Sequence, residues 1–420
     1  PILAITPQGE SRGDAARESN NKSFEIRLTN AIGKNAILRN RIEYGDSDQN
    51  GAGVGDLDLP ERAFSSANRR VNFRSSLTNP LPHGIDQDIR VYGGWNTSEQ
   101  RSLTEAQAIN VLGAFRSGGA QVQGRRAERD FHVEGNWTFK PKGKHAWRTG
   151  VLVDRNSGHA SNLTNYLGTF VFAGLDAYTA RTPITYTQRI GSVDIRVADT
   201  RTSLYVQDEI RLSSAVQLGL GVRQEWQSTI HDPLNLGPRV SLGFVARDRT
   251  TLRVGFGQFY AWHELSLVEE ARRLDGTHFS EIIIQNPGYP DPFAPGISRA
   301  STPGSRVIRS EDLVASRNWR ASVTLEKRFG IFNVRTTINR QVGADEPRAR
   351  NINPPAGGVR PDPTRGNVLL LTSIGRSQRM GAELHVSAGN LWKRRLLTSF
   401  QYSYNEGLND ADGARGLPAH

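Results

Sequence analysis

The sequence predicts an all-β fold, a large antiparallel transmembrane β-barrel. Apolar and polar residues alternate along many segments of about ten residues, which indicates strands with one apolar and one polar face. Tight turns alternate with long polar loops, as they do in outer-membrane barrels. Aromatic residues such as Trp137, Trp226 and Trp319 lie mostly near strand ends, where such barrels carry aromatic girdles. The pattern predicts about 14–18 strands.

The stretch 201–260 shows this alternation most clearly. Apolar residues occupy every second position in each of its four segments, 202–212, 216–226, 238–246 and 251–260. Only Asp208, Gln224 and Gln258 interrupt the apolar side. Strands of this length are longer than those of most soluble sheets, so we expect lipid on the apolar side.

The rest of the chain continues the pattern on both sides of this stretch. Hairpins are expected over 23–46, 67–98, 129–157, 317–341 and 379–407, and long loops over 45–66, 98–126, 261–278, 286–316 and 344–366. The spacing of Leu265, Val268 and Ala271 predicts a short helix within a loop, and LDAYTAR predicts a helical turn. We therefore expect a flexible N-terminal segment over 1–22, a barrel with long extracellular loops over 23–406, and a polar tail over 407–420.

Composition narrows the possible functions. The 420 residues carry a net charge of +11 and include no cysteine, which removes disulfides and thiolate metal sites. No apolar run of about 18 residues predicts a transmembrane helix. Basic residues are spread along the chain without a block of five or more, which argues against nucleic acid as a partner. Anionic lipid, lipopolysaccharide and anionic solutes fit the charge better.

Motifs for catalysis or metal binding are absent from the sequence. His263 and Glu264 match the first half of a zinc-binding helix, but Leu267 takes the place of the second histidine. The acidic run 46–56 ends at Leu57, where a calcium loop needs glutamate. Neither a nucleophile elbow nor a phosphate-binding loop occurs. We therefore expect no enzyme activity, no cofactor and no metal, although a hydrolytic barrel with scattered catalytic residues remains an alternative.

The polar side of the strands supplies the candidate binding residues. If the apolar side faces lipid, the candidate luminal residues are Arg211, Arg223, Glu225, Arg239, Arg253, Arg320 and Arg335. One interpretation is a structural ladder of charges along the wall. The other is a basic lumen that favours anionic solutes.

A family resemblance is carried by segments 204–212, 218–225, 237–244 and 252–260, together with Lys144, His145 and the runs 148–150 and 168–174. They resemble the barrel of TonB-dependent outer-membrane receptors. The likeness is greatest to the Oar-like branch, whose members carry a carboxypeptidase-regulatory-like N-terminal domain. It extends over roughly residues 24–405, and 200–260 is its most specific part.

The resemblance implies uptake of a scarce solute across the bacterial outer membrane through a barrel of about 22 strands. TonB would drive uptake through a plug, and the solute would be a small molecule, oligosaccharide or peptide. Outer-membrane lipid and lipopolysaccharide would surround the barrel. The sequence shows neither a plug nor a TonB box, and no C-terminal aromatic strand. Passive porin-like or structural barrel proteins are therefore the alternative, and a soluble all-β binding protein is a further one.

Overall fold

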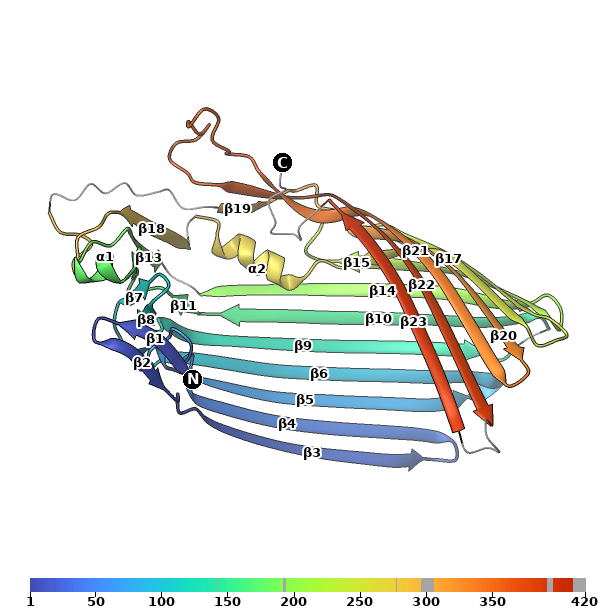
Figure 1. Cartoon of the computed structure of the whole chain (residues 1–420). Coiled ribbons are helices and arrows are strands. Elements are labelled where there is room, and N and C mark those ends of the chain that lie inside the picture. The colour runs from blue at the N-terminus through green and yellow to red at the C-terminus, as the bar shows by residue number, and fades with distance from the viewer. Residues whose placement is uncertain (142, 192–193, 277, 296–305, 391–395, 411–420) are drawn as a thin grey trace.

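The computed structural model describes the chain except residues 142, 192–193, 277, 296–305, 391–395 and 411–420. One large curled sheet dominates the described residues, and a smaller unit lies at one end of it (Figure 1). The predicted antiparallel all-β fold is confirmed.

Fourteen long strands follow one another around the large sheet, each antiparallel to its neighbours. They are β3 (Glu18–Ile32), β4 (Ala36–Ala52), β5 (Phe64–Leu81), β6 (Ile85–Ser102), β9 (Val122–Phe139), β10 (His145–Ala160), β14 (Ile195–Arg211), β15 (Val216–Gln227), β16 (Asn235–Val245), β17 (Thr251–Ala261), β20 (Ser316–Phe329), β21 (Phe332–Asn351), β22 (Val368–Asn390) and β23 (Leu396–Asn409). Two short strands, β11 (Leu163–Thr164) and β19 (Arg306–Arg309), bring the sheet to 16 strands, within the predicted range.

The two ends of the large sheet differ in their connections. Tight turns such as 33–35 and 330–331 join strands at one end, which we call the turn end. Gly33 and Gly330 take φ values of 63° and 57° there, which favour glycine. The other end, the loop end, carries the long connections and both α-helices (Figure 1). Short turns face the periplasm and long loops face the exterior in outer-membrane barrels.

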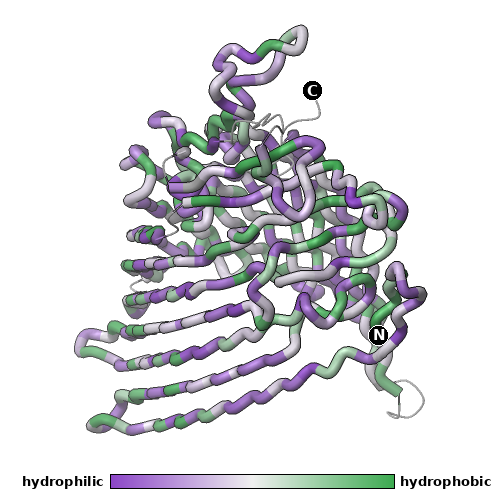
Figure 2. Tube along the Cα trace, turned by 90° about the vertical axis from the view of Figure 1, so that its left-hand side faces the viewer, coloured by the Kyte–Doolittle hydropathy of each residue, from purple (hydrophilic) through white to green (hydrophobic). Residues whose placement is uncertain are grey.

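Strand register places apolar side chains together on the convex face of the sheet. Val206 lies opposite Val222, and Val240 lies between Leu220 and Phe256. These five side chains are exposed, each by 39% or more. Figure 2 shows the underlying alternation of hydrophilic and hydrophobic residues along the strands. An exposed apolar surface of this extent is the surface that a barrel presents to lipid.

The three polar residues that interrupt the apolar side each have a local partner. The carboxylate of Asp208 lies 2.6 Å from Nδ1 of His145. The Gln224 amide donates to the carbonyl of Pro233 at 2.7 Å, and that of Gln258 donates to the Tyr260 hydroxyl at 2.8 Å. Partners within the wall reduce the cost of placing these groups on the convex face.

The loop end contains a hydrophobic core that is separate from the barrel wall. Five short strands form a sheet in the order β18-β13-β12-β7-β8, with bounds Phe279–Gln285, Thr185–Gly191, Thr169–Phe172, Ala108–Val111 and Phe115–Ser117. Phe170, Phe172 and Tyr186 are fully buried in it, and Tyr289 packs edge-on against both phenylalanines. The long loops thus form an ordered unit outside the barrel wall.

Two predicted segments at the chain ends differ from the structure or lie partly outside it. Within 1–22, a flexible segment was expected, but β1 (Ile2–Thr6) pairs with β2 (Gly9–Gly13), and Glu18 begins β3. Ile2 and Ala4 are buried in the loop-end core, which explains the order of this polar segment. Of the predicted tail 407–420, β23 extends to Asn409, and 411–420 lies outside the described residues. The boundaries of the barrel region at 23 and 406 stay a prediction.

Four predicted loops contain more strand than expected. Strand β4 continues to Ala52 and β21 continues to Asn351. The loop 98–126 contains β7 and β8, and the loop 286–316 contains β19. Polar residues can extend these strands because the hydrogen bonds between strands need only the backbone. The alternation of apolar residues marks only the part of each strand that contacts lipid.

Both predicted helical segments are confirmed, as α1 (Leu175–Thr179) and α2 (Leu265–Arg273). Within the described part of the chain, neither helix has the length and apolar character needed to cross a membrane.

We expect Val222→Arg, on the convex face, to destabilise the sheet in lipid by roughly 2–4 kcal/mol, because a charge would enter the apolar band. Urea titration of protein folded into lipid vesicles measures this loss. Gln207→Arg is the matched control on the polar face, where Glu209 lies nearby, and its effect should stay below about 1 kcal/mol. Equal losses for the two variants would contradict the assignment of the faces.

Candidate functional site

The concave face of the large sheet is lined by polar side chains in register. Tyr92 lies opposite His132, His132 opposite Asp154, and Asp154 opposite Arg201, across β6, β9, β10 and β14. Side chains at every second position of a strand point to the same face. The alternation that builds the apolar convex face therefore also places these four residues on the concave face. The wall therefore offers charges and hydrogen-bonding groups to an aqueous interior.

A cavity of about 1040 Å³ opens on this face towards the loop end, and we call it the mouth pocket. Its charged lining includes both signs, with Arg74, Arg90 and Arg126 near Glu128, Asp130 and Asp154. Arg126 pairs with Glu128 at 2.7 Å and with Glu269 of α2 at 2.8 Å. Two carboxylates of the protein thus compensate the charge of Arg126.

A second cavity, of about 510 Å³, lies farther along the wall on β15–β17, β20 and β21; we call it the wall pocket. The guanidinium carbons of Arg239 and Arg320 lie 4.3 and 4.9 Å from the ring centroid of Phe259. Gly257 lies between the two arginines in the register. A Cβ at Gly257 would lie 3.0 Å from Cγ of Arg239 and 3.3 Å from the Phe259 ring, so glycine leaves the space that this cluster occupies.

The arginines of the wall pocket lack carboxylate partners. Within the described residues, neither Arg239 nor Arg320 forms an ion pair, and the buried Nε of Arg239 has no hydrogen-bond acceptor. Buried donors without acceptors are costly, and a guanidinium binds carboxylate or phosphate with two parallel hydrogen bonds. The wall pocket is therefore arranged to accept an anionic group.

The other predicted luminal charges are paired or lie elsewhere. Arg223 binds Glu225 at 2.7 Å beside the wall pocket. Arg253 and Arg335 share Glu326, at 3.5 and 3.4 Å. These pairs match the charge-ladder interpretation.

Arg211, the last residue of β14, lies at the turn end, away from both pockets. Of the seven predicted residues, the structure brings Arg239 and Arg320 together in the wall pocket, with Arg223 and Glu225 beside it. The side chains of the mouth pocket were missed. Applying the same alternation to 85–102, 122–139 and 145–160 would have found Tyr92, His132 and Asp154.

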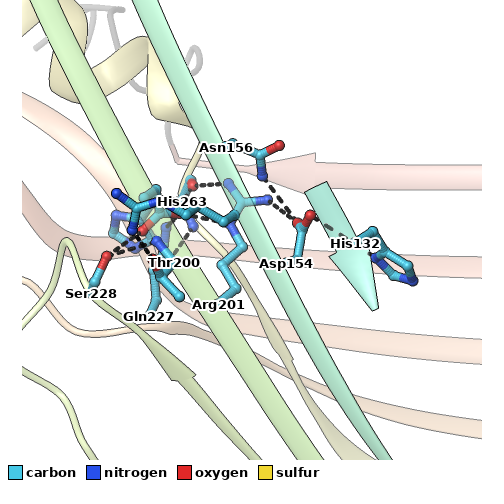
Figure 3. A network of polar contacts seen from close by, with 10 residues as sticks. His132, Asp154, Asn156, Thr200, Arg201, Gln227, Ser228 and His263 are labelled. Atoms are coloured by element: carbon cyan, nitrogen blue, oxygen red, sulfur yellow. Dashed lines mark hydrogen bonds and ion pairs between the residues drawn. The ribbon is translucent and has the colours of Figure 1, made fainter. Parts of the chain in front are cut away.

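A buried polar network ties the segment before α2 to the wall (Figure 3). Asp199 and Gln227 are each 1% exposed, and Nε2 of Gln227 donates to Asp199 at 2.8 Å and to the carbonyl of His263 at 2.9 Å. The backbone N–H of His263 donates to Oε1 of Gln227 at 2.9 Å. Arg201 donates to Asp199 and to the same His263 carbonyl, at 2.7 and 2.9 Å. The network holds α2 beside the mouth pocket, which Glu264, Leu265 and Ser266 help to line.

His263 lies after the end of β17 and is 4% exposed. Burial lowers its pKa from the usual value, with the nearby Arg309 and Arg201 acting in the same direction. The neutral imidazole donates from Nε2 to the carbonyl of Val314 at 3.0 Å. Docking of this segment therefore favours the unprotonated ring.

We expect the docked segment 262–275 to loosen in acid. A free histidine has a pKa of about 6.5, so the stabilisation is complete above that pH and declines as the pH falls towards the lower folded pKa. Limited proteolysis should cleave 262–275 faster at pH 5 than at pH 7.5, while cleavage within 354–366 serves as the internal control. His263→Gln should remove most of this pH dependence; an unchanged dependence in the variant would assign it to other groups.

Among the described residues, no group of three or more His, Asp or Glu side chains is positioned to hold a metal ion.

The comparisons with known proteins agree with this architecture. The family model described as outer membrane beta barrel domain matches residues 14–235, more than half of the chain. No protein of the curated set matches the sequence.

Several solved structures share the fold. The outer membrane transporter YddB from Escherichia coli superposes with a TM-score of 0.68 and 12% identity, covering 97% of this chain and 50% of that one. The siderophore receptor PirA from Pseudomonas aeruginosa has a TM-score of 0.56 and 14% identity, covering 93% and 57%. The alcaligin receptor FauA from Bordetella pertussis has a TM-score of 0.52 and 12% identity, covering 96% and 55%. The chain thus spans about half the length of these proteins.

These structures have the barrel fold of TonB-dependent outer-membrane transporters and receptors, as the sequence predicted, whereas the narrower resemblance to the Oar-like branch stays a prediction. A convex apolar face, a polar concave face and long loops at one end together place the protein in the bacterial outer membrane. The chain belongs to the outer membrane beta barrel domain family.

Proposed function

We propose that the chain forms part of the barrel of a TonB-dependent outer-membrane transporter, and that the solute binds on its concave wall. The observation that carries the proposal is the wall pocket, where Arg239 and Arg320 flank Phe259 without a carboxylate partner among the described residues. The shared fold with YddB, PirA and FauA supports the transport role. The chain acts by binding and passage, without catalysis.

The wall pocket favours a solute that combines negative charge with a flat or apolar part. Two guanidinium groups can bind a carboxylate, phosphate or phenolate, and the Phe259 ring offers a surface for stacking. The cavity of about 510 Å³ lies in the range of small-molecule sites. Similar structures include a ferric enterobactin receptor and the RagAB peptide transporter. A small anionic solute or acidic peptide fits better than a neutral oligosaccharide.

Strand pairing supports the view that further strands complete the barrel. Within the described residues, β3 pairs only with β4, and β23 pairs only with β22. Unpaired backbone groups cannot stay exposed to hydrocarbon, because each costs several kcal/mol. We propose that additional strands close the wall to about 22 strands and that a plug inside it contacts TonB.

We expect Arg239→Ala and Arg320→Ala each to weaken binding of an anionic probe about tenfold, since each removes charge-assisted hydrogen bonds. Ferric enterobactin, an acidic tripeptide and a neutral maltooligosaccharide are suitable probes for isothermal titration with detergent-solubilised protein. Arg253→Ala is the matched control, because Arg253 lies on the same face but outside the wall pocket and pairs with Glu326. Tighter binding of the neutral probe, or equal losses in all three variants, would contradict the anion site.

Energised transport is separable from binding by its dependence on the proton-motive force. In cells that carry the complete protein, a protonophore or loss of TonB should reduce uptake of the bound probe at least about tenfold. The main alternative, a passive porin-like or structural barrel, predicts no such dependence. Diffusion of a small neutral sugar through an unrelated porin serves as the control for membrane integrity. Unchanged uptake would exclude the TonB-dependent role while leaving the anion site intact.

A further inference from the structure

A cluster of basic side chains lies on the convex face near the loop end. Strand alternation places Arg129 on the same face as Phe131, and Arg155 on the same face as Val153. Register puts Arg129 directly opposite Ser157, and Arg155 opposite Phe131, so the two arginines are diagonal neighbours on β9 and β10. Diagonal neighbours lie about 7–8 Å apart, within reach of one shared anion.

These two arginines are uncompensated. Both are exposed, and no carboxylate of the described residues pairs with either one. Arg155 donates a single hydrogen bond, to the hydroxyl of Thr200 at 2.9 Å. Other convex arginines nearby differ, because Arg69 binds Asp46 at 3.2 Å and Arg196 approaches Asp194 at 3.6 Å.

A hollow of about 550 Å³ lies beside the pair. Arg129, Ser157, His159 and Arg196 are among the residues that line it. Asp194 pairs with His159 at 2.7 Å and with Arg196 at 3.6 Å, while Arg129 and Arg272 add two more positive charges to the lining. The hollow is therefore positively charged and large enough for a headgroup.

Aromatic residues fix the level of the cluster relative to the membrane. Trp95 lies opposite Arg129 and is 48% exposed, and Phe131 is 50% exposed. Along β10, the convex positions from Trp147 to Val153 are free of charge, and Arg155 is the next one. Aromatic girdles mark the boundary between hydrocarbon and headgroups. Arg129 and Arg155 thus lie at the headgroup level of the leaflet on the loop side.

We propose that Arg129 and Arg155 clamp a phosphate of a phosphorylated glycolipid of the outer leaflet, which we call the rim site. Guanidinium groups bind phosphate bidentately, and two of them can share its oxygens. The headgroup sugars occupy the hollow beside Ser157, and the acyl chains follow the apolar wall below Phe131. The bound lipid extends the wall's contacts with its membrane. Arg129 and Ser157 also border the mouth pocket, whereas the wall pocket shares no residue with the rim site.

The test compares Arg129→Ala/Arg155→Ala with the wild-type protein in detergent, using native mass spectrometry with added lipopolysaccharide. The double variant should bind it at least about tenfold more weakly. Arg69→Ala is the matched control, since it removes a convex arginine at the same rim that Asp46 already neutralises, and it should bind like the wild type. Arg129→Lys/Arg155→Lys keeps the charge and should lose less than the alanine pair.

Two further probes identify the lipid chemistry. Enzymatically dephosphorylated lipopolysaccharide should bind the wild type as weakly as intact lipopolysaccharide binds the double variant. Phosphatidylglycerol, which has a phosphate but no sugar, should compete poorly. Equal binding by the dephosphorylated probe, equal competition by phosphatidylglycerol, or an equal loss in Arg69→Ala would each overturn the rim site. Circular dichroism establishes that all variants are folded.

Discussion

The backbone must hydrogen-bond within the wall, because the hydrocarbon of a membrane offers no partner for its N–H and C=O groups. This protein meets the constraint with fourteen long antiparallel strands that pair in chain order. Continuous pairing sets the register, and the register in turn sets which side chains face lipid and which face the interior. The apolar convex face, both pockets and the basic cluster at the rim all depend on it.

The concave face shows two uses of charge within one wall. Arg223, Arg253 and Arg335 have carboxylate partners and support the wall electrostatically. Arg239 and Arg320 share the Phe259 ring and have no carboxylate partner among the described residues, and we propose that they bind the solute. The neighbours across strands thus distinguish paired from unpaired arginines, a difference that a charge count of the lumen would miss.

The loop end adds ordered structure where a barrel could end in simple loops. A compact aromatic core and a buried polar network hold its segments, including α2 at the edge of the mouth pocket. Buried networks of this kind position a segment accurately when all members are satisfied, and they respond sharply when one member changes its protonation state. His263 is the buried histidine of this network, and its burial lowers the pKa of the ring.

Period-two alternation in the sequence alone determined the all-β class, the lipid-facing side and the tight turns, because each of these follows from local pattern and turn chemistry. The alternation also assigned all seven predicted charges to the polar face of the strands. The helical spacing of Leu265 and Val268 predicted α2. The sequence did not reveal which charges meet, since Arg239 and Arg320 are 81 positions apart in number and become neighbours only through the pairing of β16, β17 and β20. The order of residues 1–22 likewise came from tertiary packing, because Ile2 and Ala4 are buried in one core with distant residues such as Val111, Phe172 and Ile284. Contacts between distant strands depend on register and sheet curvature, which only the folded chain decides.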